Sequence, residues 1–138
     1  SCAGWDTISH ESKLQEILKQ IKSWGVRTSV FVDPHLRMVE GAKKIGADRI
    51  ELYTEPYASG YHSDRKSATE PYMVAAKRAK EIGLGLNAGH DLDLQNLKHL
   101  KENIPYLDEV SIGHALICDA LYYGLENTIQ MYLRKLQE

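Results

Sequence analysis

Long apolar runs are absent from this 138-residue sequence, and no charged-then-apolar leader opens it. A membrane-spanning helix needs about 20 consecutive apolar residues, so we expect no membrane partner and a cytoplasmic protein. The net charge of −2 provides no basic field, which argues against nucleic acid as a partner. Small charged substrates remain compatible with this composition.

Cysteine is also scarce, because the chain has only Cys2 and Cys118, far apart in the sequence. No CxxC pair and no Cys/His cluster is present, so no metal site, redox pair or cofactor is predicted. We expect both thiols to be reduced, as in an intracellular protein. The G-x-G-x-x-G turn of dinucleotide-binding sheets is missing too.

What the sequence does contain is a repeated junction between helix and strand. In Lys22–Gly25, Lys43–Gly46 and Lys80–Gly83, a lysine near the helix end favours the negative pole of the helix dipole, and the glycine can adopt the left-handed cap conformation. A β-like run follows each junction, and a fourth run follows Pro105. The predicted strands cover residues 28–32, 49–54, 84–88 and 109–113.

The segments around these strands have apolar residues at three- and four-residue spacing, which is typical of amphipathic helices. The predicted helices cover residues 11–24, 35–45, 70–82, 92–103 and 115–137. Asp33 before Pro34 predicts an N-cap followed by a first-turn proline. Residues 55–68 are too long for a simple strand-to-helix joint and are interpreted as a mobile lid or an interface loop.

Strands that alternate with helices predict a parallel sheet, either open and doubly wound or closed as a barrel. Polar residues end all four predicted strands: Asp33, Thr54, His90 and His114. This pattern, and the missing glycine-rich turn, favour an α/β fold of the parallel (β/α) barrel type, that is, a TIM barrel. Eight units need about 200–250 residues. We therefore expect residues 1–138 to form only the C-terminal part of a single (β/α)8 barrel domain, about four units, with the N-terminal half absent.

Two residues near the predicted strand ends could carry chemistry. Glu51 interrupts an apolar run, and a buried carboxylate is costly without a partner, so it is interpreted either as a catalytic group or as half of a structural salt bridge. His90 follows Asn87-Ala88-Gly89 at a strand end, where an imidazole can act as general acid or base. The alternative for His90 is a surface histidine beside an N-cap aspartate.

A candidate phosphate site lies at the last strand-to-helix turn. Gly113 and His114 precede the final predicted helix, whose amides could bind an anion. The alternative is a tight turn in which Gly113 only avoids a clash. The remaining histidines are expected at the surface: His10, His35, His62 and His99.

Three segments of the chain resemble, in order, the strand-end motifs of the pyridoxine 5′-phosphate synthase family. They are Arg49–Thr54 with Pro56-Tyr57-Ala58, Asn87–His90, and Ile112–Ala115. The resemblance covers essentially the whole chain. It implies an enzyme that uses no metal or cofactor and condenses 1-deoxy-D-xylulose 5-phosphate with 3-amino-2-oxopropyl phosphate. The products are pyridoxine 5′-phosphate, inorganic phosphate and water, and a homo-oligomer is implied.

The resemblance also implies residue roles. His90 matches a proton donor, and Glu51 matches a carboxylate of the active-site interior. Asp91, Gly113 and His114 match residues that contact substrate or product, although the family usually has glycine at the position of Asp91.

One further match and one gap concern the start of the chain. Ser1 falls near a substrate-contacting threonine of the family. The family's proton-accepting histidine and glutamate belong to earlier strands, so we expect this chain to be inactive alone. The alternative function is a non-catalytic half-barrel that binds phosphorylated metabolites.

Overall fold

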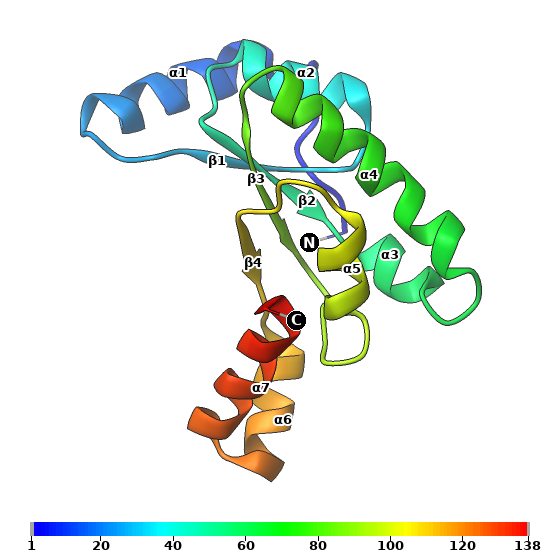
Figure 1. Cartoon of the computed structure of the whole chain (residues 1–138). Coiled ribbons are helices and arrows are strands. Elements are labelled where there is room, and N and C mark those ends of the chain that lie inside the picture. Colours follow the sequence, from blue (N-terminus) through cyan, green and yellow to red (C-terminus); the bar gives the residue numbers. More distant parts are fainter. Residues whose placement is uncertain (1, 138) are drawn as a thin grey trace.

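The computed structural model describes residues 2–137, in which helices and strands alternate along the chain (Figure 1). The elements are α1 (Glu11–Ser23), β1 (Ser29–Val32), α2 (Leu36–Lys44), β2 (Arg49–Tyr53), α3 (Glu55–Gly60), α4 (Arg65–Glu81), β3 (Gly85–Gly89), α5 (Leu97–Asn103), β4 (Glu109–Ser111), α6 (His114–Tyr123) and α7 (Leu125–Gln137). No helix within this part of the chain is both long and apolar enough to cross a bilayer.

The four strands form one sheet in the order β1-β2-β3-β4, and every neighbouring pair is parallel. The predicted α/β class and parallel sheet are thus confirmed. Sequential order is that of a barrel wall, whereas a doubly wound sheet reverses its order at a switch point. Within residues 2–137 the sheet stays open, with β1 and β4 at its edges, so the arrangement is consistent with part of a TIM-like barrel.

Alternation along the strands gives the sheet an apolar face and a polar face. The apolar face is buried against α2 and α4 (Figure 1) and includes Val30, Val32, Ile50, Leu52, Leu86 and Ala88. Side chains of the other parity stand on the opposite, open face. Glu51 therefore points to the open face, together with Asn87 and Ser111, and away from the covering helices.

The interpretation of residues 55–68 as a lid or interface loop is wrong. Residues 55–60 form α3, which has Pro56 in its first turn. α4 then begins at Arg65, because the carboxylate of Asp64 accepts a hydrogen bond from the Ser67 amide at 3.1 Å and caps the helix. The segment is therefore built mostly of helix, and the Asp64 cap was the signal that the sequence analysis missed.

Other predicted boundaries also shift. The expected helix 115–137 is two helices, because Gly124 has φ of 77° and ends α6. α5 begins at Leu97 instead of residue 92, since the Asp93 carboxylate holds the preceding turn through the Asn96 amide at 2.8 Å. The expected Asp33 cap is wrong as well: α2 has no side-chain cap, and Asp33 Oδ1 accepts from the Gly4 amide at 3.3 Å.

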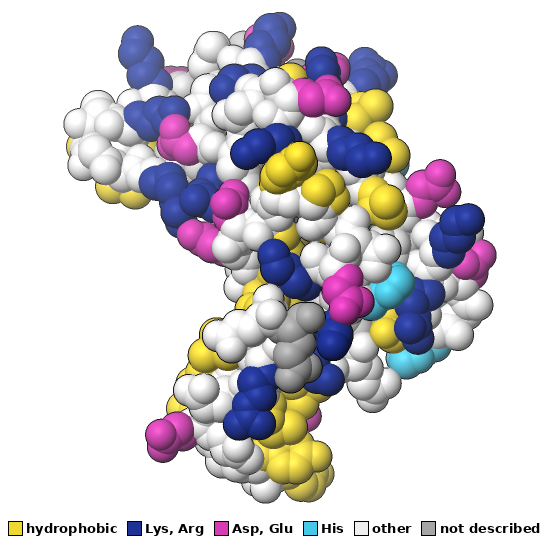
Figure 2. All heavy atoms as spheres, in the orientation of Figure 1, with side chains coloured by type: hydrophobic (Ala, Val, Ile, Leu, Met, Phe, Trp, Pro, Cys, Tyr) yellow, Lys and Arg dark blue, Asp and Glu magenta, His cyan; other side chains and the backbone are white. Residues whose placement is uncertain are grey.

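The α6–α7 hairpin extends beyond β4, away from the body of the sheet (Figure 1). No residue of α6 is buried within the described structure, although the helix is largely apolar. Figure 2 shows hydrophobic side chains gathered on this hairpin, whereas on the rest of the visible face hydrophobic side chains are interspersed with charges of both signs. Exposed apolar residues of the hairpin are Ile117, Leu121, Tyr122, Tyr123, Leu125, Ile129 and Leu133.

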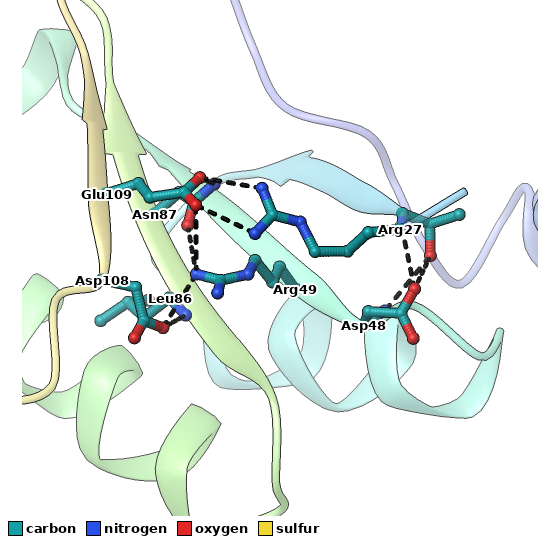
Figure 3. A network of polar contacts seen from close by, with 8 residues as sticks. Arg27, Asp48, Arg49, Leu86, Asn87, Asp108 and Glu109 are labelled. Carbon is teal, nitrogen blue, oxygen red and sulfur yellow. Dashed lines mark hydrogen bonds and ion pairs between the residues drawn. The ribbon is translucent and has the colours of Figure 1, made fainter. Parts of the chain in front are cut away.

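Charged side chains fill the amino-terminal end of the open face (Figure 3). Arg27 forms a bidentate pair with Glu109, with both nitrogen-to-oxygen distances at 3.0–3.1 Å. Arg49 lies beside this pair, 3.9 Å from Glu109, and its guanidinium is 3.1 Å from Asp108 and 3.1 Å from the Asn87 side-chain oxygen. These contacts join the β1 side of the sheet to β4, so this end of the face is occupied by structural ion pairs.

Asp48, at the same end, gives a test of stability against pH. The Lys22 ammonium 2.7 Å away, followed by the Thr28 amide, lowers the pKa of Asp48 from 3.8 to about 2. A carboxyl with a lower pKa in the folded state stabilises the fold above the unfolded pKa, and this contribution disappears as the pH falls through the folded pKa. Asp48→Asn should therefore reduce the free energy of unfolding by about 1 kcal/mol at pH 7, a value discounted because both side chains are partly exposed.

Denaturant unfolding at pH 7 and at several values down to pH 2 measures this effect. The difference from wild type should shrink between about pH 4 and pH 2. Glu16→Gln, at an exposed position of α1, is the control and should change little at any pH. A difference that is equally large at pH 7 and near pH 2 would contradict the assignment.

Candidate active site

The carboxyl ends of β2, β3 and β4 border a pocket of about 570 Å³. Five of the six predicted site residues line it together: Glu51, His90, Asp91, Gly113 and His114. The sixth, Ser1, lies outside the described residues. Parallel strands place their carboxyl ends at one edge of the sheet, which is why residues up to 63 positions apart in sequence meet here.

His90 stands at the end of β3 in an unusual backbone conformation. Its φ is 101°, and that of Asp91 is 56°. Residues other than glycine rarely adopt such positive values. The imidazole packs edge-to-face on Tyr53, with ring centroids 5.0 Å apart, and lies 6.4 Å from the Phe31 ring. These aromatic contacts hold the ring over the open face of the sheet.

The carboxylate of Asp91 contacts the imidazole directly. Asp91 Oδ2 lies 2.9 Å from His90 Nδ1. An ionised carboxylate only accepts hydrogen bonds, so this contact assigns a proton to Nδ1. Nε2 has no hydrogen-bond partner within residues 2–137, and His90 is one of the residues that line the pocket.

Glu51 lies beside the end of β4. Its Oε2 accepts a hydrogen bond from the Ser111 hydroxyl at 3.3 Å, and it forms no ion pair within the described residues. The alternative of a structural salt bridge is therefore not supported. Gly89 gives the carboxylate its space, because a Cβ at that position would overlap Glu51 Oε1.

Gly113 and His114 form the turn that starts α6. Gly113 is the N-cap, and its carbonyl accepts from the Ile117 amide at 3.3 Å. The amides of the first helical turn have no partner inside a helix and carry the positive end of its dipole. A Cβ on Gly113 would meet no other described atom within 4 Å, so close packing is not the reason for glycine here.

Two groups near the site were missed by the sequence analysis. Ser111 and Cys118 both line the pocket; Cys118 lies four residues after His114 on α6, a spacing that puts both on one helix face. Burial raises the pKa of the Tyr53 phenol, so this neighbour of His90 stays protonated near neutral pH.

The histidine expectations hold in part. His10, His35 and His62 are exposed, as predicted, but His99 is half-buried. It lies 3.1 Å from the Thr69 hydroxyl and contacts the rings of Tyr57 and Tyr61, and burial lowers its pKa. None of these four histidines lines the pocket, and Cys2 and Cys118 form no disulfide within the described residues.

Comparison with known proteins gives one consistent family. The model of the family described as "Pyridoxal phosphate biosynthesis protein PdxJ" matches residues 1–138. A protein of Cytophaga hutchinsonii named pyridoxine 5′-phosphate synthase is 67% identical over 138 residues, which is 100% of this chain and 58% of that protein. Relatives of the same name from Christiangramia forsetii and Flavobacterium johnsoniae are 56% and 57% identical, each over 99% of this chain and 58% of the relative.

The chain thus spans 58% of the length of these relatives. Among solved structures, the crystal structure of the Amycolatopsis orientalis BexX/CysO complex contains a chain with a TM-score of 0.60 and 16% identity. That match covers 96% of this chain and 50% of the other, and supports the fold alone. The family match over every residue and the high identities are decisive: the chain belongs to the PdxJ family of pyridoxal phosphate biosynthesis proteins.

Proposed function

We propose that this chain provides part of the active site of a pyridoxine 5′-phosphate synthase. The reaction would condense 1-deoxy-D-xylulose 5-phosphate with 3-amino-2-oxopropyl phosphate and release pyridoxine 5′-phosphate, inorganic phosphate and water. The observation that carries the proposal is the single pocket lined by Glu51, His90, Asp91, Gly113 and His114. The names of the close relatives support the same activity.

His90 is proposed as the proton donor. Amine attack on a carbonyl, loss of water and ring closure each require proton transfer, which a positioned imidazole can perform. The Asp91 carboxylate holds the proton on Nδ1, so Nε2 is the nitrogen that gives a proton to substrate. Asp91 would then contact substrate through its backbone amide, while its carboxylate orients the imidazole.

Glu51 is proposed as the second catalytic group. A carboxylate on the open face can accept a proton or stabilise the positive charge that develops on nitrogen as the amine adds to a carbonyl. The Ser111 hydroxyl and the small Gly89 fix the position of this carboxylate. Glu51 and His90 line the same pocket, so both can act on one bound substrate.

We further propose that residues 1–138 form about four units of a (β/α)8 barrel and do not catalyse the reaction alone. The open sheet, the sequential strand order and the greater length of the relatives support this domain assignment. The largely exposed α6 supports a homo-oligomer, because contiguous exposed apolar surface commonly marks an interface.

The direct test is an assay of the full-length protein and of the 138-residue chain with both substrates. The full-length protein should form pyridoxine 5′-phosphate and the isolated chain should not. Phosphate binding without turnover by the full-length protein would instead favour a non-catalytic binding module, and turnover of another sugar phosphate would favour a different enzyme.

Gly113→Val tests the proposed phosphate site at the start of α6. The fold should tolerate the change, because a Cβ there meets no described atom within 4 Å, but the larger side chain should block an anion from the helix amides. We expect phosphate and substrate affinity to fall by about 10–100-fold, the equivalent of losing a hydrogen bond to a charged group. Isothermal titration with inorganic phosphate measures the effect.

The control for this experiment is Ala120→Val, on the same helix but outside the pocket, which should leave phosphate affinity unchanged. Unchanged affinity in Gly113→Val, with an unchanged melting temperature, would remove this turn from the substrate site.

A further inference from the structure

The backbone of His90 needs an anchor outside its own segment. With φ of 101° at His90 and 56° at Asp91, two successive residues that are not glycine occupy the region of positive φ. Such conformations cost free energy and persist only where surrounding contacts enforce them. The contacts that enforce this one also determine where the imidazole stands.

Thr54 makes the closest such contact. It follows β2 at the point where Tyr53 pairs with Gly89, so it lies directly beside the end of β3. Its hydroxyl donates a hydrogen bond to the His90 carbonyl oxygen at 2.5 Å, and its amide donates to the Gly89 carbonyl oxygen at 3.0 Å. The Thr54 side chain is fully buried, so water does not compete for this bond.

The Thr54 hydroxyl does not cap α3, although its position at the start of that helix would predict this role. Thr54 is the N-cap of α3, where a threonine side chain ordinarily accepts a hydrogen bond from an amide of the first turn. No such side-chain bond is formed here, and the hydroxyl instead serves the His90 carbonyl. α3 therefore has no side-chain cap, and the carbonyl of the strained His90 backbone has a hydrogen-bond donor.

Neighbouring hydrogen bonds fix the far end of the same loop. The Tyr57 hydroxyl donates to the Asn96 carbonyl oxygen at 2.6 Å, and the Tyr61 hydroxyl donates to the Gln95 carbonyl oxygen at 2.9 Å. Within residues 2–137, Thr54 is the side chain that bonds to the backbone of His90 itself. The loop is thus held at both ends, and Thr54 holds the end that carries the imidazole.

We infer that Thr54 is a positioning residue: its buried hydroxyl holds the His90 backbone so that the imidazole stands beside Tyr53 and Asp91 in the pocket. The effect on turnover rests on the proposed function, whereas the effect on the geometry of His90 does not. Losing the hydroxyl lets the strained backbone relax and moves the imidazole, and small misplacements of a catalytic group reduce rates strongly.

The test compares Thr54→Val, Thr54→Ser and Thr128→Val in the full-length protein. Valine keeps the shape of threonine but loses the hydroxyl, and serine keeps the hydroxyl. Thr128 is the matched control, because it is also fully buried and donates a hydrogen bond, 2.9 Å to the Gly124 carbonyl oxygen, but lies outside the pocket. Thr54→Val should lower kcat by about 10–100-fold with little change in KM.

Thr54→Ser should keep kcat within about 3-fold of wild type, and Thr128→Val should leave kcat unchanged at a temperature where all variants are folded. Equal losses of kcat in Thr54→Val and Thr128→Val would assign Thr54 to general stability and overturn the inference. A Thr54→Ser variant as slow as Thr54→Val would overturn the role of the hydroxyl.

A second readout does not depend on turnover. In ¹⁵N spectra of the histidine side chains, with His90 assigned from the His90→Asn variant, Thr54→Val should shift or broaden the His90 signals, whereas Thr128→Val should not. If the wild-type protein makes no pyridoxine 5′-phosphate but the His90 signals still move, the proposed function fails and the positioning role stands. Unmoved His90 signals in Thr54→Val overturn the inference, whatever the activity.

Discussion

Replacing His90 with asparagine should lower the turnover of pyridoxine 5′-phosphate formation by about 10²–10⁴-fold, the range expected when a general acid is removed. The physical reason is that His90 lines the pocket and Nε2 of its imidazole has no hydrogen-bond partner within residues 2–137, so Nε2 is free to give a proton to substrate. Asparagine tolerates positive φ better than most residues, so it suits the backbone at this position.

Steady-state kinetics of the full-length protein measures this effect, and KM should change much less than kcat because the imidazole transfers a proton instead of holding substrate charge. His35→Asn is the matched control: His35 is exposed at the start of α2 and lies outside the pocket. A His90→Asn variant with wild-type kcat would assign His90 to structure.

The strands were predictable because their signals are local. The lysine–glycine junctions at Gly25, Gly46 and Gly83 all have positive φ in the structure, as a helix-terminating glycine requires. Apolar runs that follow such junctions become buried strands of a parallel sheet. Three predicted strands follow these junctions and the fourth follows Pro105, and all four overlap the observed strands to within a few residues.

The helices between them were less predictable, because their boundaries depend on single capping interactions. Asp64 starts α4 with a side-chain hydrogen bond, but it is one of several residues in this polar segment that could cap a helix. Gly124 lies in an otherwise continuous apolar periodicity, and its φ of 77° ends α6 even though the pattern continues. Periodicity reports which face is apolar, and it says little about where a helix stops.

The candidate site, like the fold, could be predicted from the sequence only in part. Glu51, His90 and Gly113 could be placed at strand ends from sequence, and parallel topology then brings them to one edge of the sheet. The link between Thr54 and His90 could not be predicted, because it depends on the relative position of two strand ends and on strain at His90 that no residue pattern signals.

Glu51 and Gly89 provide the second large expected effect, in two variants that separate chemistry from position. Glu51→Gln keeps the size of the side chain and removes its charge, so it should lower kcat by about 10²–10³-fold if the carboxylate stabilises developing charge or accepts a proton. The Ser111 hydroxyl can still donate to the glutamine oxygen, so we expect the variant to keep the fold and the melting temperature of the wild type.

Gly89→Ala keeps the Glu51 carboxylate but changes its position. The added Cβ would overlap Glu51 Oε1, which is the end of a flexible side chain and can move away. We expect kcat to fall by about 10–100-fold, the size of effect that follows from misplacing a catalytic group by about 1 Å. In the double variant the two losses should not add, because displacing a glutamine that has already lost the catalytic charge costs little further rate. Kinetics of the four proteins in this cycle measures the coupling. Fully additive losses would mean that Gly89 acts on the reaction through another group, such as the adjacent His90, and that Glu51 does not require the space that Gly89 leaves.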